Sequence, residues 1–177
     1  VKELKDKTGF PGMKLMQFAF GDYDRHLAGI YYDDDPNEAG GVDLSKCKTP
    51  REVKEAKLKN PFLPHNFEKN CIAYLGTHDN DVMTNFIQEH PDQKAAMKDY
   101  LCIWRDEDIL DTMIGALMRS NANVVIFTPQ DLLHMDKYSR INTPGVAVGN
   151  WQFRIDKKAL SKEFSHHLLV MTKEAGR

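Results

Sequence analysis

Short apolar runs alternate with amphipathic stretches along this chain. Three runs have the length and composition of strands buried on both faces, and they cover residues 13–20, 71–75 and 124–127. Residues 92–104 and 107–119 instead place apolar side chains three and four positions apart, which is the spacing of one helix face. The pattern therefore predicts at least two helices between the second and the third strand.

Residues typical of helix ends predict further helices outside the region between the second and third strands. Thr49, Pro50 and Glu52 supply a capping residue, a first-position proline and an acidic partner, so a short, charged helix is expected to about residue 59. Residues 1–8 have the composition of a helix end, and a closing helix is expected over 157–173. Because the chain starts within a helix end and without methionine, we expect it to be a piece of a longer protein.

The order of these elements predicts an α/β fold with a parallel sheet. Crossover helices lie between strands, and each strand ends in a polar cluster, as in sheets whose ligand groups lie at the carboxyl ends of the strands. A (β/α)8 barrel has its site at the same place, but about three strands cannot close a barrel of eight. The pattern leaves two possibilities, a small α/β domain or part of a larger barrel.

Composition narrows the functional classes. The 177 residues suffice for about one domain, and 24 Lys and Arg against 26 Asp and Glu give a net charge of −2, which argues against non-specific nucleic-acid binding. No apolar run reaches the ~18 residues of a membrane-spanning helix, and no secretory leader is evident. Three cysteines far apart in the sequence, with no C-x-x-C pair, favour a reduced, cytoplasmic compartment.

The densest polar cluster, residues 77–81, follows the second predicted strand. A carboxylate there can stabilise positive charge on a substrate, act as a base or bind a cation, and His78 can donate to a substrate hydroxyl. Asp and Asn are also favoured helix caps, so we expect Asp81 to be a cap and leave Asp79 open between the two roles. A metal site formed by these three side chains is a weaker hypothesis, because no second cluster has ligand spacing.

Four other side chains have more ordinary interpretations. Asp131, after the third strand, is expected to cap a helix. Gln17 lies within the first apolar run, so it is either a hydrogen-bonded core residue or points to a site. Trp151 and Phe153 could stack on a sugar, but core packing is the default for aromatic side chains at alternate positions.

Sequence strings along almost the whole chain resemble the 4-α-glucanotransferases of glycoside hydrolase family 77, also called amylomaltases or disproportionating enzymes. In family order they are F-P-G-M-K with Q-F-A-F in 10–20, N-P-F-L-P-H-N in 60–66, G-T-H-D-N-D in 76–81, Q-D-L-L in 130–133, N-T-P-G in 142–145 and G-N-W in 149–151. Each string alone is moderate evidence, but six in the same order are specific.

The resemblance implies a fold and a reaction. Residues 1–177 would be the C-terminal portion of a (β/α)8 barrel, with three of its parallel strands and their crossover helices. The family transfers α-1,4-glucan segments between maltooligosaccharides, retaining the anomeric configuration through a covalent glycosyl-enzyme intermediate. The implied substrates are maltooligosaccharides and α-1,4-glucans, the implied partner is the upstream remainder of the barrel, and neither a cofactor nor a metal is needed.

The resemblance also implies site residues. Asp79 corresponds to the family's third catalytic carboxylate, which stabilises the transition state. His78, Phe18, Asp22 and Asn142 correspond to substrate contacts.

Two departures from the family pattern limit what this chain can do. The nucleophile Asp and the acid/base Glu lie upstream of the F-P-G-M-K string in the family, and residues 1–9 carry neither motif, so the isolated chain is expected to be inactive. Residues 21–59 form an insertion where the family has a short link. Two alternatives remain, a non-catalytic carbohydrate-binding module or pseudoenzyme and, less favoured, a metal-dependent hydrolase built on His78 and Asp79.

Overall fold

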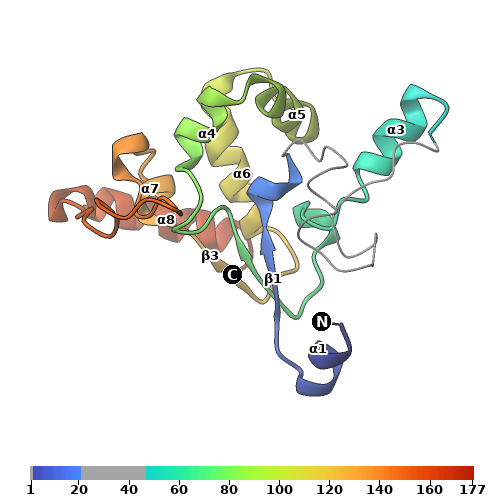
Figure 1. The fold of residues 1–177 in the computed structure, drawn as a ribbon, viewed down its shortest axis with the longest axis horizontal. Helices are drawn as coiled ribbons and strands as arrows, with labels where there is room; N and C mark the ends of the chain where they lie inside the picture. Colours follow the sequence, from blue (N-terminus) through green and yellow to red (C-terminus); the bar gives the residue numbers. More distant parts are fainter. Residues whose placement is uncertain (1, 21–46) are drawn as a thin grey trace.

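A three-stranded parallel sheet lies at the centre of the chain (Figure 1). The computed structural model describes residues 2–20 and 47–177. The strands are β1 (Gly12–Leu15), β2 (Cys71–Tyr74) and β3 (Val124–Ile126). Their order in the sheet follows their order in the sequence, and β2 pairs in parallel with β1 and with β3. The predicted α/β arrangement with about three parallel strands is therefore confirmed.

The helices occupy the positions that the sequence pattern predicts, with some changes at their ends. Helices α4, α5 and α6 lie between β2 and β3 along the chain and gather on one side of the sheet (Figure 1). The helices of the described residues are α1 (Lys2–Thr8), α3 (Pro50–Lys57), α4 (Met83–Glu89), α5 (Pro91–Leu101), α6 (Ile109–Met118), α7 (Pro129–Leu132) and α8 (Lys162–Glu174). None of them is long and apolar enough to cross a membrane.

Helix α3 begins as its sequence predicts. The Thr49 hydroxyl accepts a hydrogen bond from the Glu52 amide, and the Glu52 carboxylate accepts one from the Thr49 amide. This reciprocal pair satisfies two amides that a helix start leaves without partners. The short, charged helix expected to about residue 59 is thus present.

Helix α6 supplies the largest share of the core. Its predicted apolar stripe is buried throughout, comprising Ile109, Leu110, Met113, Ile114, Leu117 and Met118. These side chains pack in one cluster with Cys71 and Ala73 of β2, which are fully buried. The helix-covered face of the sheet and the period-3.6 face of α6 therefore form a single core.

The opposite face of the sheet is apolar, and the described residues cover only part of it, around the buried Leu15. Side chains alternate along a strand and register partners share a face, so Met13, Ile72 and Val124 lie on one face with Tyr74 and Ile126. Met13, Val124 and Ile126 are 61%, 44% and 43% exposed. We call these five residues the open sheet face.

The first apolar run is only partly a strand. It leaves the sheet after Leu15 and continues as a 3-10 helix over Met16–Ala19, so the predicted strand 13–20 is too long and Gln17 lies outside it. The Gln17 amide still donates to the Leu75 carbonyl, at 3.1 Å, and Phe20 donates back to Gln17, which tightens the turn. Gly76 faces the buried Gln17 side chain so closely that a β-carbon would lie 3.0 Å from its Oε1.

Two predicted helix ends also need correction. Helix α5 stops at Leu101 because Cys102 adopts a left-handed backbone with φ of 56°. Trp104 therefore lies beyond the helix and is 92% exposed, instead of packing on its apolar face. The closing helix α8 starts at Lys162, after a separate 3-10 turn, and Ser161 is its capping residue.

Candidate functional site

The polar segments after β2 and β3 meet at the carboxyl edge of the sheet. Because the strands are parallel, the residues that follow Tyr74 and Ile126 emerge at the same edge. They line a small hollow together with the loop that follows α7, and its lining includes Thr77, His78, Asp81, Gln130 and Arg140. This is the location at which parallel α/β sheets hold their ligand groups.

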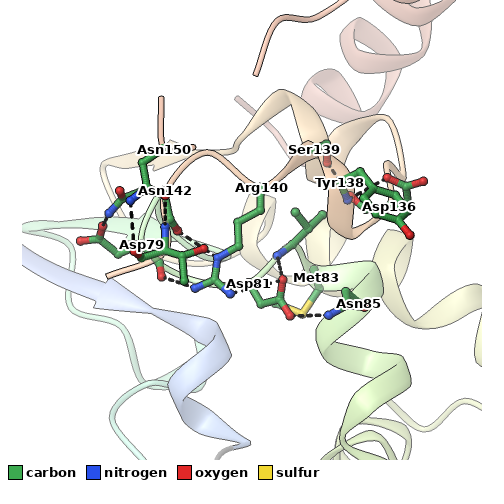
Figure 2. Close-up of polar contacts among 12 residues, drawn as sticks. Asp79, Asp81, Met83, Asn85, Asp136, Tyr138, Ser139, Arg140, Asn142 and Asn150 are labelled. Carbon is green, nitrogen blue, oxygen red and sulfur yellow. Dashed lines mark hydrogen bonds and ion pairs between the residues drawn. The ribbon is translucent and has the colours of Figure 1, made fainter. Parts of the chain in front are cut away.

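Three of the predicted site residues come together at this edge. The Asn142 side-chain amide donates to Asp79 Oδ1 at 2.6 Å, and His78 Nε2 lies 3.3 Å from the same oxygen (Figure 2). The backbone amide of Asn142 also donates to the His78 carbonyl, at 3.2 Å. Within the described residues no hydrogen bond engages Asp79 Oδ2, and the carboxylate is half-exposed, so one oxygen faces solvent.

Arg140 ties the two loops of this cluster together. Its Nη2 donates to the Asp79 carbonyl and its Nε donates to the Asn142 carbonyl, both at 2.9 Å. Its Nη1 lies 3.8 Å from Asp81 Oδ1, so the guanidinium stands between Asp79 and Asp81 (Figure 2). The sequence offers no signal for this role beyond a cation just before the N-T-P-G string.

The start of α4 differs from the prediction for Asp81. Val82 is the capping position and provides no side-chain bond, while the Asp81 carboxylate accepts from the Val82 amide and from the Asn85 side chain. The next amide, that of Met83, donates to Asp131 Oδ1 at 2.9 Å. The prediction that Asp81 caps this helix is therefore wrong, because a buried carboxylate from beyond β3 takes that place.

Asp131 is the buried acid of this edge. Its residue is only 3% exposed, and Oδ2 accepts from the Thr128 hydroxyl at 2.9 Å. Burial raises the pKa of the Asp131 carboxyl, while the bonds from Met83 and Thr128 favour its ionised form. Its own helix, α7, is capped by Thr128, so Asp131 is a cap as predicted, but of α4.

The loop over 141–151 is closed by its own side chains. Asn150 accepts from the Thr143 amide at 2.9 Å and donates to the carbonyls of Thr143 and Val146, at 3.2 and 2.8 Å (Figure 2). Trp151 donates from its backbone to the Ile141 carbonyl at 2.8 Å. Its indole approaches the His78 ring, with 4.9 Å between centroids and 43° between planes.

The two remaining predicted contacts are not part of this cluster. Phe18 lies in the 3-10 turn after β1, exposed, with its ring edge-on to that of Phe62 at 5.8 Å. It follows a strand and so lies toward the same edge of the sheet as Asp79. Asp22 lies outside the described residues.

The described residues contain no group of three or more His, Cys, Asp or Glu side chains placed to hold a metal ion. His78 and Asp79 are adjacent, but the Asp81 carboxylate is turned to Val82, Asn85 and Arg140. The geometry thus gives the metal-dependent hydrolase hypothesis no support.

Comparison with known proteins assigns a family to this arrangement. A family model described as 4-alpha-glucanotransferase matches residues 47–160, which include the Asp79, His78 and Asn142 cluster. The chain belongs to the 4-alpha-glucanotransferase family. The resemblance carried by the sequence strings is thereby confirmed.

Relatives in this family match the chain over nearly all its length. The 4-alpha-glucanotransferase of Clostridium butyricum is 30% identical over 99% of this chain and 29% of its own length. The chloroplastic/amyloplastic 4-alpha-glucanotransferase of Arabidopsis thaliana is 36% identical over 88% of this chain and 21% of its own length. An amylomaltase from Streptococcus agalactiae, solved in complex with acarbose, superposes with a TM-score of 0.72 at 29% identity, over 99% of this chain and 29% of that one.

The chain therefore spans less than a third of the length of these 4-alpha-glucanotransferases. Its fold is that of an α/β fragment within such a protein, with three parallel strands and their helices.

Proposed function

We propose that residues 1–177 are the C-terminal portion of the (β/α)8 catalytic barrel of a 4-α-glucanotransferase, with 21–59 as an inserted segment. The open sheet face supports a part-barrel, because the inward side chains of the remaining strands would fill the space beside it. The length of the relatives supports it as well, since they are long enough to hold the five further strands of a barrel of eight.

The proposed activity is transfer of α-1,4-glucan segments between maltooligosaccharides, in starch and glycogen metabolism. In a retaining double displacement, a carboxylate attacks the anomeric carbon while an acid protonates the leaving oxygen. An acceptor hydroxyl, in place of water, then gives its proton to the same residue, attacks the anomeric carbon and displaces the carboxylate. The nucleophile and the acid/base belong to the upstream part of the protein. This chain contributes the third carboxylate and its neighbours.

The observation that carries the proposal is the geometry around Asp79. Asn142 and His78 occupy Oδ1 and hold the carboxylate in place, which leaves Oδ2 free for a sugar hydroxyl. A carboxylate fixed in this way stabilises the positive charge that develops at the anomeric carbon without having to reorganise. Phe18 and Asp22 are proposed as further substrate contacts.

Binding to the chain itself tests the proposal. We expect maltoheptaose to bind in the millimolar range in a calorimetric titration. Asp79→Asn should weaken binding modestly, because it replaces the carboxylate with a neutral amide. Asn142→Ala should weaken it because it removes the donor to Asp79 Oδ1. Asp92→Asn is the matched control, because that carboxylate is exposed in the first turn of α5. Equal binding by all of these variants, or none by the unaltered chain, would refute the proposal.

Activity gives the second test. The chain alone is expected to form neither glucose nor longer products from maltotriose, because two of three catalytic carboxylates are absent. In the longer protein, Asp79→Asn should lower turnover by about 10²–10³-fold and affinity much less, with a smaller loss for His78→Ala. Transfer by the isolated chain, or normal turnover of Asp79→Asn, would contradict the assignment.

A further inference from the structure

Trp151 is a large aromatic side chain left open to solvent at the edge of the site. It is 58% exposed, so much of its indole has no protein contact. Its backbone has φ of 65°, a left-handed conformation that is strained for a bulky residue. Such a conformation persists only where the surroundings impose it.

Two sets of hydrogen bonds impose it here. The Trp151 amide is bound to the Ile141 carbonyl, and the preceding side chain, Asn150, makes three bonds to the backbone of Thr143 and Val146. These bonds fix the backbone at Trp151, and the contact of its indole with the His78 ring limits the orientation of the side chain. A preformed aromatic surface loses little conformational entropy when it binds.

The neighbours of the indole are polar groups suited to hydroxyls. Its ring lies against His78, whose Nε2 is 3.3 Å from the Asp79 carboxylate, and Asn142 donates to the same carboxylate. An aromatic face is thus continuous with an imidazole, a carboxylate and an amide. A pyranose ring has the complementary surface, with an apolar C–H face and a rim of hydroxyls.

We propose that the indole of Trp151 is the stacking surface for one glucose unit of the α-1,4-glucan, adjoining the unit held by Asp79. This inference rests on the proposed function and adds to it a binding residue that the resemblance did not supply. Trp104, the other tryptophan of the chain, is the natural control, since it is 92% exposed at a turn after α5.

Fluorescence tests the contact directly. In Trp104→Phe the emission comes from Trp151 alone, and we expect maltoheptaose to shift it saturably and to shield it from acrylamide. In Trp151→Phe, where Trp104 is the reporter, the same titration should leave emission and quenching unchanged. Sorbitol at matched concentrations corrects for the bulk effect of the sugar.

Binding affinity measures how much the Trp151 indole contributes. Calorimetry should show about tenfold weaker maltoheptaose binding for Trp151→Ala, a smaller loss for Trp151→Phe, which keeps a ring, and no change for Trp104→Ala. Trp151→Gly should match Trp151→Ala, and because glycine adopts this backbone without strain, it keeps the loop in place.

The outcomes separate this inference from the proposed function. Unchanged affinity in both Trp151→Ala and Trp151→Gly, with no shielding of Trp151, overturns the stacking surface and leaves the sugar site of Asp79 standing. No maltoheptaose binding by the unaltered chain overturns both.

Discussion

Replacing Arg140 should destabilise the chain and loosen the pair formed by Asp79 and Asn142. Arg140→Ala removes two hydrogen bonds from a charged donor to backbone carbonyls. Such bonds contribute ~1.5–3 kcal/mol when buried, and partial exposure here reduces this to about 1 kcal/mol each. The contact with Asp81 at 3.8 Å adds little, as is usual for ion pairs near the surface. The free energy of unfolding should therefore fall by about 2 kcal/mol.

Urea denaturation measures this loss, and side-chain amide NMR measures its local effect. We expect the Asn142 side-chain amide protons to exchange faster in Arg140→Ala, because the guanidinium fixes the carbonyls of both loops. Arg140→Lys should recover less than half of the lost stability, since one ammonium cannot reproduce the fork that reaches two acceptors.

Arg51→Ala is the matched control for Arg140. Its guanidinium is exposed and pairs with Glu55 one helical turn away, an interaction that contributes about 0.3–0.5 kcal/mol. If Arg140→Ala unfolds at the same urea concentration as Arg51→Ala and leaves the Asn142 amide unchanged, then Arg140 does not hold this site together.

Three further changes probe the rest of the molecule. Burial raises the pKa of Asp131, so the folded state binds the carboxyl proton more tightly than the unfolded state does, and the free energy of unfolding falls as the pH rises above about 4. In urea titrations between about pH 4 and pH 7, Asp131→Asn should flatten this dependence on pH. Arg177→Ala removes hydrogen bonds to three carbonyls, one at the last residue of α6 and two just after it, and should lower stability by about 1–3 kcal/mol and speed amide exchange at that helix end. The open sheet face should make the chain self-associate, and Ile126→Glu should shift light scattering toward monomer without changing the circular dichroism spectrum.

The elements that the sequence predicts well are those decided by neighbouring residues. The apolar stripe of α6 and the capping box at Thr49 depend on spacings of three and four residues, and both are present in the structure. The early end of β1 depends instead on the Leu75 carbonyl and on Gly76, which are distant in sequence. No local pattern contains that information.

In the site, too, features set by neighbouring residues could be predicted and those set by distant residues could not. Asp131 is recognisable as a cap, but its helix lies across the fold, at Met83. Arg140 bonds to main-chain carbonyls, which have no residue-specific signature. The assignments of Asp79, His78 and Asn142 came from the family resemblance. The bond between Asn142 and Asp79 joins two segments that are distant in sequence, so no local pattern predicts it.

The parallel register of the sheet has a consequence for how fast the chain folds. Leu15 pairs with Tyr74 and Tyr74 with Ile126, so each ladder joins residues separated by a long stretch of chain. The contacts among α4, α5 and α6 are local by comparison. Because loop closure must precede any gain from a distant pairing, we expect the helical block to form within the first kinetic phase and strand pairing to limit the rate. A ribosome-bound chain that has reached α6 would thus carry folded helices and both strands of the β1–β2 pair, and only β3 would still have to join the sheet.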